Sequence, residues 1–375
     1  MAVGNHRFAQ LIIDQQAIYE NIKNAKQNLP DGDELFMTVK ANGYGHGAIQ
    51  VAHVAQRAGA DGFCVSIIDE ALELRRGGIA KAPILVLGIG DAIDVKVAAD
   101  NNVSLTAASS DWLEKAAEVL ELYPVTQKVK IHLALDTGMG RIGFQTAAEL
   151  QAAIEVLEQH SDVMEWEGLF THFATADDPD TEYFELQKKR FTEMMKVVKQ
   201  RPKYVHIANS ATSLWHDFSG SNMIRLGAAG YGLNPSGDAI PTTPYPLKPA
   251  MSFVSQLVYT KQIAAGSSVG YGATYAAKQA EWIGTIPVGY ADGVPRRLQG
   301  FHVLIDGHEC EIVGRVCMDQ LMVRLPYKMD PGTKVVLMGE SNDKKITAED
   351  IAEYIDTIGY DVICGFSARL AHRYV

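Results

Sequence analysis

Lys40 is the residue of this sequence whose type and setting point most directly to chemistry. It ends the apolar run LFMTVK (35–40) and precedes the glycine-rich segment ANGYGHG (41–47). A lysine at the carboxyl end of a buried strand is desolvated, which lowers its pKa and allows the neutral amine to form a Schiff base. From these residues alone, a rim lysine in a solvated salt bridge is an equally good interpretation. The glycines match neither a P-loop nor the dinucleotide-binding fingerprint.

Lys40 lies within an alternation of apolar runs and amphipathic stretches that covers the first two thirds of the chain. Eight apolar runs have strand character: LFMTVK (35–40), GFCVSI (62–67), PILVLG (83–88), VSLTA (103–107), VKIHLAL (129–135), WEGLFTH (166–172), YVHIAN (204–209) and MIRLG (223–227). The stretches between them, such as residues 14–29, have helical spacing of apolar residues. This order predicts an eight-stranded parallel α/β (TIM-type) barrel, with an open doubly wound sheet as the less favoured alternative. Barrel enzymes carry their reactive groups at the carboxyl ends of the strands.

A proline-rich stretch then separates the barrel from a region of different character. Five of the 14 prolines fall between residues 235 and 249, which predicts an extended connection. Beyond it, β-like runs dominate, with a hairpin turn at Asp306-Gly307 and one helix that begins after Thr347. We therefore expect a barrel domain over residues 1–240 and a mainly β domain over residues 241–375. The early strand FAQLIID (8–14) is a candidate to pair with the second domain.

Composition excludes several classes of protein. Apolar residues make up 47% of the 375 residues, which excludes intrinsic disorder, and the net charge of −11 argues against non-specific binding to nucleic acid or anionic lipid. The four cysteines form no CxxC pair or Cys/His cluster, so we expect no metal site. The first residues lack the apolar core and cleavage signal of a secretory leader, so we expect none, and no apolar run approaches the roughly 18–20 residues that cross a bilayer. We expect a soluble, cytoplasmic protein.

Lys40 belongs to one of several segments that, in type and order, resemble motifs of the alanine racemases. The segments are VKANGYGHG (39–47), DTGMGRIGF (136–144), THFATAD (171–177), HIANSA (206–211), IRLGAAGYGL (224–233), VGYGATY (269–275), VGYADG (288–293) and VGRVCMDQ (313–320). This family of pyridoxal phosphate (PLP) enzymes of fold type III has an α/β barrel followed by a β domain. The resemblance implies interconversion of L- and D-alanine, which supplies D-alanine for peptidoglycan. A serine or broad-specificity amino-acid racemase of the same fold is the alternative.

Other classes fit less well. A PLP-dependent decarboxylase on a similar barrel would want an acid at the position of Arg225. A non-catalytic PLP-binding protein can be a lone barrel, whereas this chain continues into a β domain that carries Tyr271 and Met318. A dehydrogenase lacks support because no dinucleotide fingerprint is present.

The resemblance also implies which residues hold PLP. Lys40 would bind it covalently, and its phosphate would be held by Tyr44, Ser210, the backbone of Gly227 and Ala228, and Tyr360. Without the resemblance, Ser210 is well explained as a helix N-cap, and the two tyrosines as half-buried packing residues.

Arg225 would face the pyridine nitrogen of PLP, oriented by His206, with His172 near the ring. An arginine is permanently charged and only donates hydrogen bonds, so the ring nitrogen is expected to stay unprotonated. The ring is then a weaker electron sink, which suppresses decarboxylation and transamination. Taken alone, Arg225 could equally form a barrel-end salt bridge, and the two histidines could be satisfied core residues.

Racemisation removes a proton from one face of Cα and delivers one to the other, so two groups must flank the substrate. The resemblance implies that these groups are Lys40 and Tyr271 of a partner chain, in a homodimer with shared active sites. Tyr290 and Met318 would join Tyr271 and narrow the access to the site, leaving room for little more than a methyl side chain. Ordinary interface packing is the plainer interpretation of these two residues.

Arg141 is the candidate to bind the substrate carboxylate through a bidentate contact. A loop salt bridge is its plainer interpretation. Many relatives orient this arginine with a lysine, carbamylated in some, two residues before the DTGM run. Ala134 occupies that position here, so we expect another acceptor, such as a bound chloride, beside Arg141.

Overall fold

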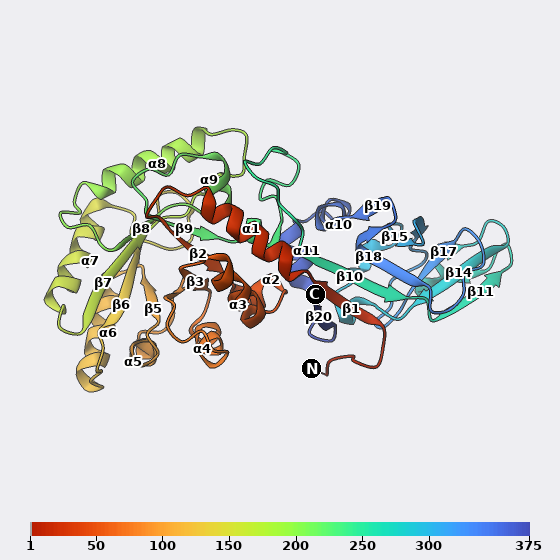
Figure 1. The fold of residues 1–375 in the computed structure, drawn as a ribbon, viewed down its shortest axis with the longest axis horizontal. Coiled ribbons are helices and arrows are strands. Elements are labelled where there is room, and N and C mark those ends of the chain that lie inside the picture. The colour runs from red at the N-terminus through yellow and green to blue at the C-terminus, as the bar shows by residue number, and fades with distance from the viewer. Residues whose placement is uncertain (1) are drawn as a thin grey trace. The chain divides into compact units, whose positions relative to one another are not determined.

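The structure is a computed structural model that describes residues 2–375 (Figure 1). The chain forms two compact units. The barrel unit comprises Ala17–Gly43 and Gly47–Pro249, and the β unit comprises residues 2–16, Tyr44–His46 and Ala250–Val375. The chain thus passes between the units several times. The domain boundary near residue 240 stays a prediction.

Eight parallel strands form the core of the barrel unit, in the order β8-β7-β6-β5-β4-β3-β2-β9. They are β2 (Glu34–Thr38), β3 (Gly62–Val65), β4 (Ile84–Val86), β5 (Ser104–Ala107), β6 (Val129–Ala134), β7 (Met164–Phe170), β8 (Tyr204–His206) and β9 (Met223–Leu226). A bridge between Ala208 and Ile224 links the two ends of this order and nearly closes the sheet. The eight-stranded barrel predicted from the alternating pattern is confirmed.

One helix precedes the first barrel strand, and others lie between successive barrel strands. They are α1 (Gln15–Gln27), α3 (Ala48–Ala58), α4 (Ile68–Arg76), α5 (Val95–Asp100), α6 (Ser110–Leu122), α7 (Ala147–Gln159), α8 (Glu182–Met195) and α9 (Ser210–Trp215). Each amphipathic helix buries one face, as α1 does with Ile18 and Ile22. Inside the barrel, an apolar layer is built from Phe36, Cys64, Leu85, Tyr204 and Met223. This layer supports the polar groups described below.

The β unit contains one large and two small sheets. The large sheet has the order β16-β15-β18-β10-β1-β20, with β19 beside β18. The second sheet has the order β11-β14-β17, and the third consists of β12 and β13. The bounds are β1 (Ala9–Ile13), β10 (Met251–Gln256), β11 (Tyr259–Ile263), β12 (Ser268–Val269), β13 (Tyr275–Ala276), β14 (Glu281–Ile286), β15 (His302–Ile305), β16 (His308–Glu311), β17 (Leu321–Leu325), β18 (Lys334–Ser341), β19 (Lys344–Ile346) and β20 (Ala371–Tyr374). Strand β1 pairs with β10 on one side and β20 on the other.

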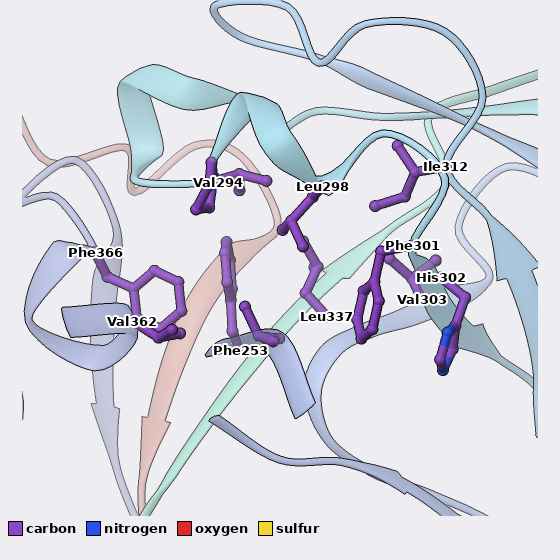
Figure 2. A pocket seen from close by; sticks show the side chains of 12 residues that line it. Phe253, Val294, Leu298, Phe301, His302, Val303, Ile312, Leu337, Val362 and Phe366 are labelled. Atoms are coloured by element: carbon purple, nitrogen blue, oxygen red, sulfur yellow. The ribbon is translucent and has the colours of Figure 1, made fainter. Parts of the chain in front are cut away.

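Two helices, α10 (Ala348–Ile355) and α11 (Gly359–Gly365), complete the β unit. Thr347 caps α10 by accepting a hydrogen bond from the amide of Asp350, as its spacing predicts. Figure 2 shows the apolar pocket of this unit, where Phe253 of β10 and Leu337 of β18 face Leu298, Phe301 and Val362. His302 is the one lining residue with an ionisable side chain, so we interpret the pocket as part of the core.

Among residues 2–375, no helix combines the length and the apolar character that crossing a membrane requires.

Candidate active site

Lys40 comes two residues after the end of β2 and begins a turn with an unusual backbone. Residues 41–44 all have positive φ, between 51° and 62°, and only one of the four is a glycine. The left-handed region costs a non-glycine residue about 1–2 kcal/mol, so such a run persists only where the surroundings hold it. The segment α2 (Lys40–Tyr44) is therefore a left-handed turn, and it places Lys40 at the carboxyl end of a barrel strand.

Hydrogen bonds within the barrel unit hold this turn. The amide of Gly43 donates to the carbonyl of Val39 over 2.8 Å, and the side chain of Asn42 accepts from the amide of Ala48 at the start of α3. The carboxylate of Glu70 accepts from the amide of Ala41 over 2.7 Å. The same carboxylate accepts from the amide of Ser66 in the loop after β3. Glu70 thus ties the turn after Lys40 to the end of the neighbouring strand.

Arg225, in β9, is a buried cation surrounded by neutral acceptors. One terminal nitrogen donates to Nδ1 and to the carbonyl oxygen of His206, both over 2.7 Å, and the other donates to the carbonyl oxygen of Thr171 over 2.9 Å. The guanidinium also lies over the ring of Phe170. Burial lowers the pKa of Arg225 to about 10, so the group keeps its charge at neutral pH. No acidic side chain among residues 2–375 forms an ion pair with it.

His172 lies beside this cation and is neutral. Burial lowers its pKa to about 3, with further lowering from the positive charges of Arg225, Arg141 and Lys40. Its Nδ1 is 3.4 Å from Arg225. These electrostatic contacts show that the barrel fold brings together Lys40, Arg141, His172 and Arg225, which are far apart in the sequence. Three of the four are cationic side chains, so the place suits an anionic ligand.

The side chain of Ser210 accepts hydrogen bonds from backbone amides and does not cap a helix. The N-cap of α9 is Asn209, whose side chain accepts from the amide of Thr212 over 2.9 Å. The hydroxyl oxygen of Ser210 instead accepts from the amide of Gly227 over 2.8 Å and from that of Ala229 over 3.4 Å. With its oxygen engaged by two amides, the Ser210 proton is available to an acceptor such as a phosphate oxygen. The helix-cap interpretation of Ser210 is wrong.

Arg141 lies in a loop that closes on itself. Asp136 accepts hydrogen bonds from the amides of Gly138 and Gly140, both over 3.0 Å, and residues 135 and 144 form a bridge at the base of the loop. Arg141 is exposed, and within residues 2–375 it forms no ion pair with an acidic side chain. Ala134 is buried in β6. The loop geometry alone therefore leaves the guanidinium open to a ligand.

The other site residues taken from the resemblance belong to the β unit. Tyr44 and Tyr360 lie side by side, with ring centroids 6.3 Å apart. Tyr271, Tyr290 and Met318 are 70%, 42% and 52% exposed, which is unusual for aromatic and apolar side chains. Hydrogen bonds from the amides of residues 290 and 291 to the carbonyls of residues 317 and 318 hold Tyr290 next to Met318.

Glu70, His132 and Glu167 escape the motif-based prediction. His132 lies in the run VKIHLAL and Glu167 in the run WEGLFTH, and both side chains are buried. A charged or ionisable residue inside an apolar strand is a usable signal, because a barrel interior accepts such a group only with partners. No local signal marks Glu70, since its role depends on a loop that it meets only in the folded chain.

Comparison with known proteins agrees with this arrangement. The family model described as "Alanine racemase, N-terminal domain" matches residues 13–235, and that described as "Alanine racemase, C-terminal domain" matches residues 250–374. The chain belongs to the alanine racemase family. The resemblance seen in the motifs is thus confirmed, and with it the assignment to isomerases that racemise alanine.

Individual relatives match over the whole chain. The alanine racemase of Levilactobacillus brevis is 56% identical over 374 residues, covering 100% of both chains. A crystal structure of alanine racemase from E. faecalis superposes with a TM-score of 0.97 at 48% identity, again over 100% of both chains. The histidine racemase from Leuconostoc mesenteroides subsp. sake has a TM-score of 0.93 at 33% identity, with the same coverage. A serine or broad-specificity racemase is not favoured by these matches.

The contacts of Glu70 predict a local effect of its removal. In the Glu70→Ala variant, the amide of Ala41 loses a charged acceptor, which destabilises the closed turn by about 1–2 kcal/mol. Hydrogen exchange in the peptide that covers residues 40–47 should then be about 5- to 30-fold faster. Glu73→Ala is the matched control, because Glu73 is exposed on the same helix. Equal exchange in the two variants would contradict the role of Glu70.

Proposed function

We propose that the chain interconverts L- and D-alanine with PLP bound at the carboxyl end of the barrel, and so supplies D-alanine for peptidoglycan. The observation that carries the proposal is the surroundings of Arg225. This buried cation is held by neutral acceptors, lies near Lys40 and Arg141, and has no carboxylate in direct contact among residues 2–375. A guanidinium only donates hydrogen bonds, so it would bind a ring nitrogen that carries no proton.

The residues of the barrel unit fit the chemical groups of PLP. Lys40 would bind the cofactor covalently, and Ser210 with the backbone of Gly227 and Ala228 would hold its phosphate. The Ser210 hydroxyl would donate its proton to a phosphate oxygen, because its own oxygen already accepts from the amides of Gly227 and Ala229. Arg225 would face the ring nitrogen with His206 behind it, and His172 would lie by the ring. The roles of Tyr44 and Tyr360 as phosphate ligands stay predictions.

When bound, PLP supplies a conjugated system that stabilises negative charge at Cα of the amino acid. The protein's part is to limit that stabilisation and to move protons. Arg225 keeps its protons at neutral pH, because its pKa of about 10 is far above that of an imidazole or a pyridine. His172 is neutral at that pH and adds no charge. Proton return to Cα is then favoured over loss of the carboxylate.

Two groups would exchange protons with Cα, the amine of Lys40 on one face and the hydroxyl of Tyr271 on the other. We propose that Tyr271 comes from a partner chain in a homodimer. Its high exposure supports this proposal, because an aromatic side chain exposed to this degree gains free energy when another surface covers it. Tyr290 and Met318, which are also exposed, would cover the access to the site and favour a methyl side chain.

Lys40→Ala tests the assignment of Lys40. The variant should lose racemisation of L-alanine, and after denaturation and dialysis it should lose the visible absorbance of the bound cofactor. Loss of optical rotation is measured with L-alanine, L-serine and L-histidine. Wild-type protein should act on L-alanine far faster than on the other two. Colour retained by the dialysed variant would contradict covalent binding at Lys40, and equal rates on alanine and serine would contradict alanine specificity.

Mixing two inactive variants tests the shared site. Equal amounts of Lys40→Ala and Tyr271→Phe chains, unfolded and refolded together, should recover about one quarter of the wild-type activity. Half of the dimers are then hybrids, and each hybrid has one site with both groups intact. Each variant refolded alone is the control. The absence of recovery, with hybrid dimers detected by native mass spectrometry, would rule out shared sites.

We also propose that a small anion such as chloride orients Arg141 in place of the lysine found in many relatives. Replacing acetate by chloride at constant ionic strength should then lower KM for alanine by about 2- to 5-fold, the effect of an ion pair worth up to about 1 kcal/mol. A variant with Arg141→Lys should lose this dependence. A KM that does not change with chloride would contradict the anion.

A further inference from the structure

Arg225 is the first member of a chain of hydrogen bonds that runs through the barrel interior. Its terminal nitrogen donates to Nδ1 of His206 over 2.7 Å. Nε2 of His206 is 2.8 Å from Nδ1 of His132, and Nε2 of His132 is 3.0 Å from a carboxylate oxygen of Glu167. All four side chains are buried, with no more than 4% of any residue exposed. The chain therefore links Arg225 to a carboxylate that it does not touch.

The chemistry of the two ends determines the proton positions between them. An arginine only donates, so Nδ1 of His206 accepts. Burial and the charge of Arg225 hold the pKa of His206 well below its usual value, so the ring is neutral and its single proton is on Nε2. That proton points to Nδ1 of His132, whose own proton is then on Nε2 and points to Glu167. Every bond in the chain is donated in the same direction, from Arg225 towards the carboxylate.

Glu167 is ionised although it is buried. Burial on its own raises the pKa of this carboxyl, but the hydrogen bonds from His132 and Ser104 and the charge of Lys130 outweigh burial and lower the pKa below its usual value. The Ser104 hydroxyl donates over 2.5 Å, and the Lys130 ammonium is 3.5 Å away. The chain thus has a positive end at Arg225 and a negative end at Glu167, with two neutral imidazoles between them.

A β-bulge and a glycine place the side chains of Glu167 and His132. In the pairing of β6 with β7, Ile131 faces Trp166 while His132 faces Gly168, so Glu167 is an extra residue in a β-bulge. A bulge turns a side chain that regular alternation would direct elsewhere. At position 168, a Cβ atom would be 2.2 Å from Nδ1 of His132, so only glycine leaves room for that ring.

We propose that Glu167 is a positioning residue for racemisation, acting on Arg225 through His132 and His206. Its carboxylate fixes the direction of the chain, so that Nδ1 of His206 is always an acceptor for Arg225. The guanidinium is then held in one orientation, with its remaining donors directed to the ligand. This inference rests on the proposed function in one respect, that Arg225 faces the ring nitrogen of PLP.

A purely structural role makes a different prediction. If the chain only satisfies buried polar groups, changing Glu167 lowers stability and leaves kcat of the folded protein unchanged. If Glu167 positions Arg225, kcat falls while KM for alanine changes little, because Arg225 is proposed to face the ring nitrogen and not the substrate carboxylate.

The test uses Glu167→Gln in the full-length protein loaded with PLP. The amide keeps an oxygen that can accept from His132 but removes the charge. We expect kcat to fall by about 10- to 100-fold, the range for groups that orient a contact residue from behind, with KM within about twofold of wild type. Glu281→Gln is the matched control, because Glu281 also carries a buried carboxylate in a strand. It lies in β14 of the β unit, and its side chain bonds Tyr275 and none of the four side chains that link Arg225 to Glu167. It should keep its kcat.

A second measurement does not depend on activity. In wild-type protein labelled with ¹⁵N at histidine, His132 and His206 should both be neutral and protonated at Nε2. The Nε2 proton of His132 should resonate far downfield, as for a hydrogen bond to a carboxylate, and should move upfield in Glu167→Gln. The same spectra recorded without PLP should give the same tautomers, because all four hydrogen-bonded side chains belong to the barrel unit and bond one another.

The outcomes separate this inference from the proposed function. An unchanged kcat in folded Glu167→Gln, or a proton on Nδ1 of His206 in wild type, would overturn the inference even if Lys40 binds PLP. Lys40→Ala could keep its visible absorbance after dialysis while both histidine tautomers are as expected. The proposed function would then fail, and the series of hydrogen bonds from Arg225 to Glu167 would still hold. Should Glu167→Gln not fold, Glu167→Asp replaces it, since the shorter side chain draws the carboxylate back from Nε2 of His132 and keeps the charge. A fall in its kcat with an unchanged KM supports the inference, and an unchanged kcat together with an upfield shift of the Nε2 proton of His132 overturns it.

Discussion

The buried charge of Arg225 is the constraint on which the rest of the barrel interior depends. Moving a guanidinium out of water costs several kcal/mol unless acceptors replace the lost solvent. The replacements come from several strands: His206 from β8, Thr171 from the end of β7, and Glu167 of β7 through His132 of β6. None of these strands could stabilise the charge alone. The site therefore exists only once the barrel has closed.

The charges around Arg225 follow from the same constraint. Lys40 and Arg141 add positive charge to that of Arg225, so a fourth and a fifth cation would raise the local repulsion, and both His172 and His206 are neutral. The result is a small cationic site in a chain whose net charge is −11. Net charge thus argues against polyanionic partners over the surface as a whole, while the three cations gathered near His172 still suit an anionic ligand.

Irregular backbone is concentrated where the proposed chemistry takes place. The left-handed turn follows Lys40, the β-bulge presents Glu167, and the bridged loop carries Arg141. Regular strands and helices cannot aim three side chains from different elements at one place, since their directions are set by alternation and by the helical period. The free energy lost in such irregular segments is recovered from the packed layers beneath them.

The sequence by itself determined the alternation of strands and helices, the position of Lys40 at a strand end, the cap at Thr347, and the family, because these depend on local spacing and on motifs. The tertiary structure alone decided that Asn209 and not Ser210 caps α9, because the two neighbours compete for one helix start. It also decided that His132 and Glu167 support Arg225. These residues lie on three strands, 35 and more positions apart, and hydrogen bonds between them depend on the curvature and closure of the sheet, which no local pattern specifies.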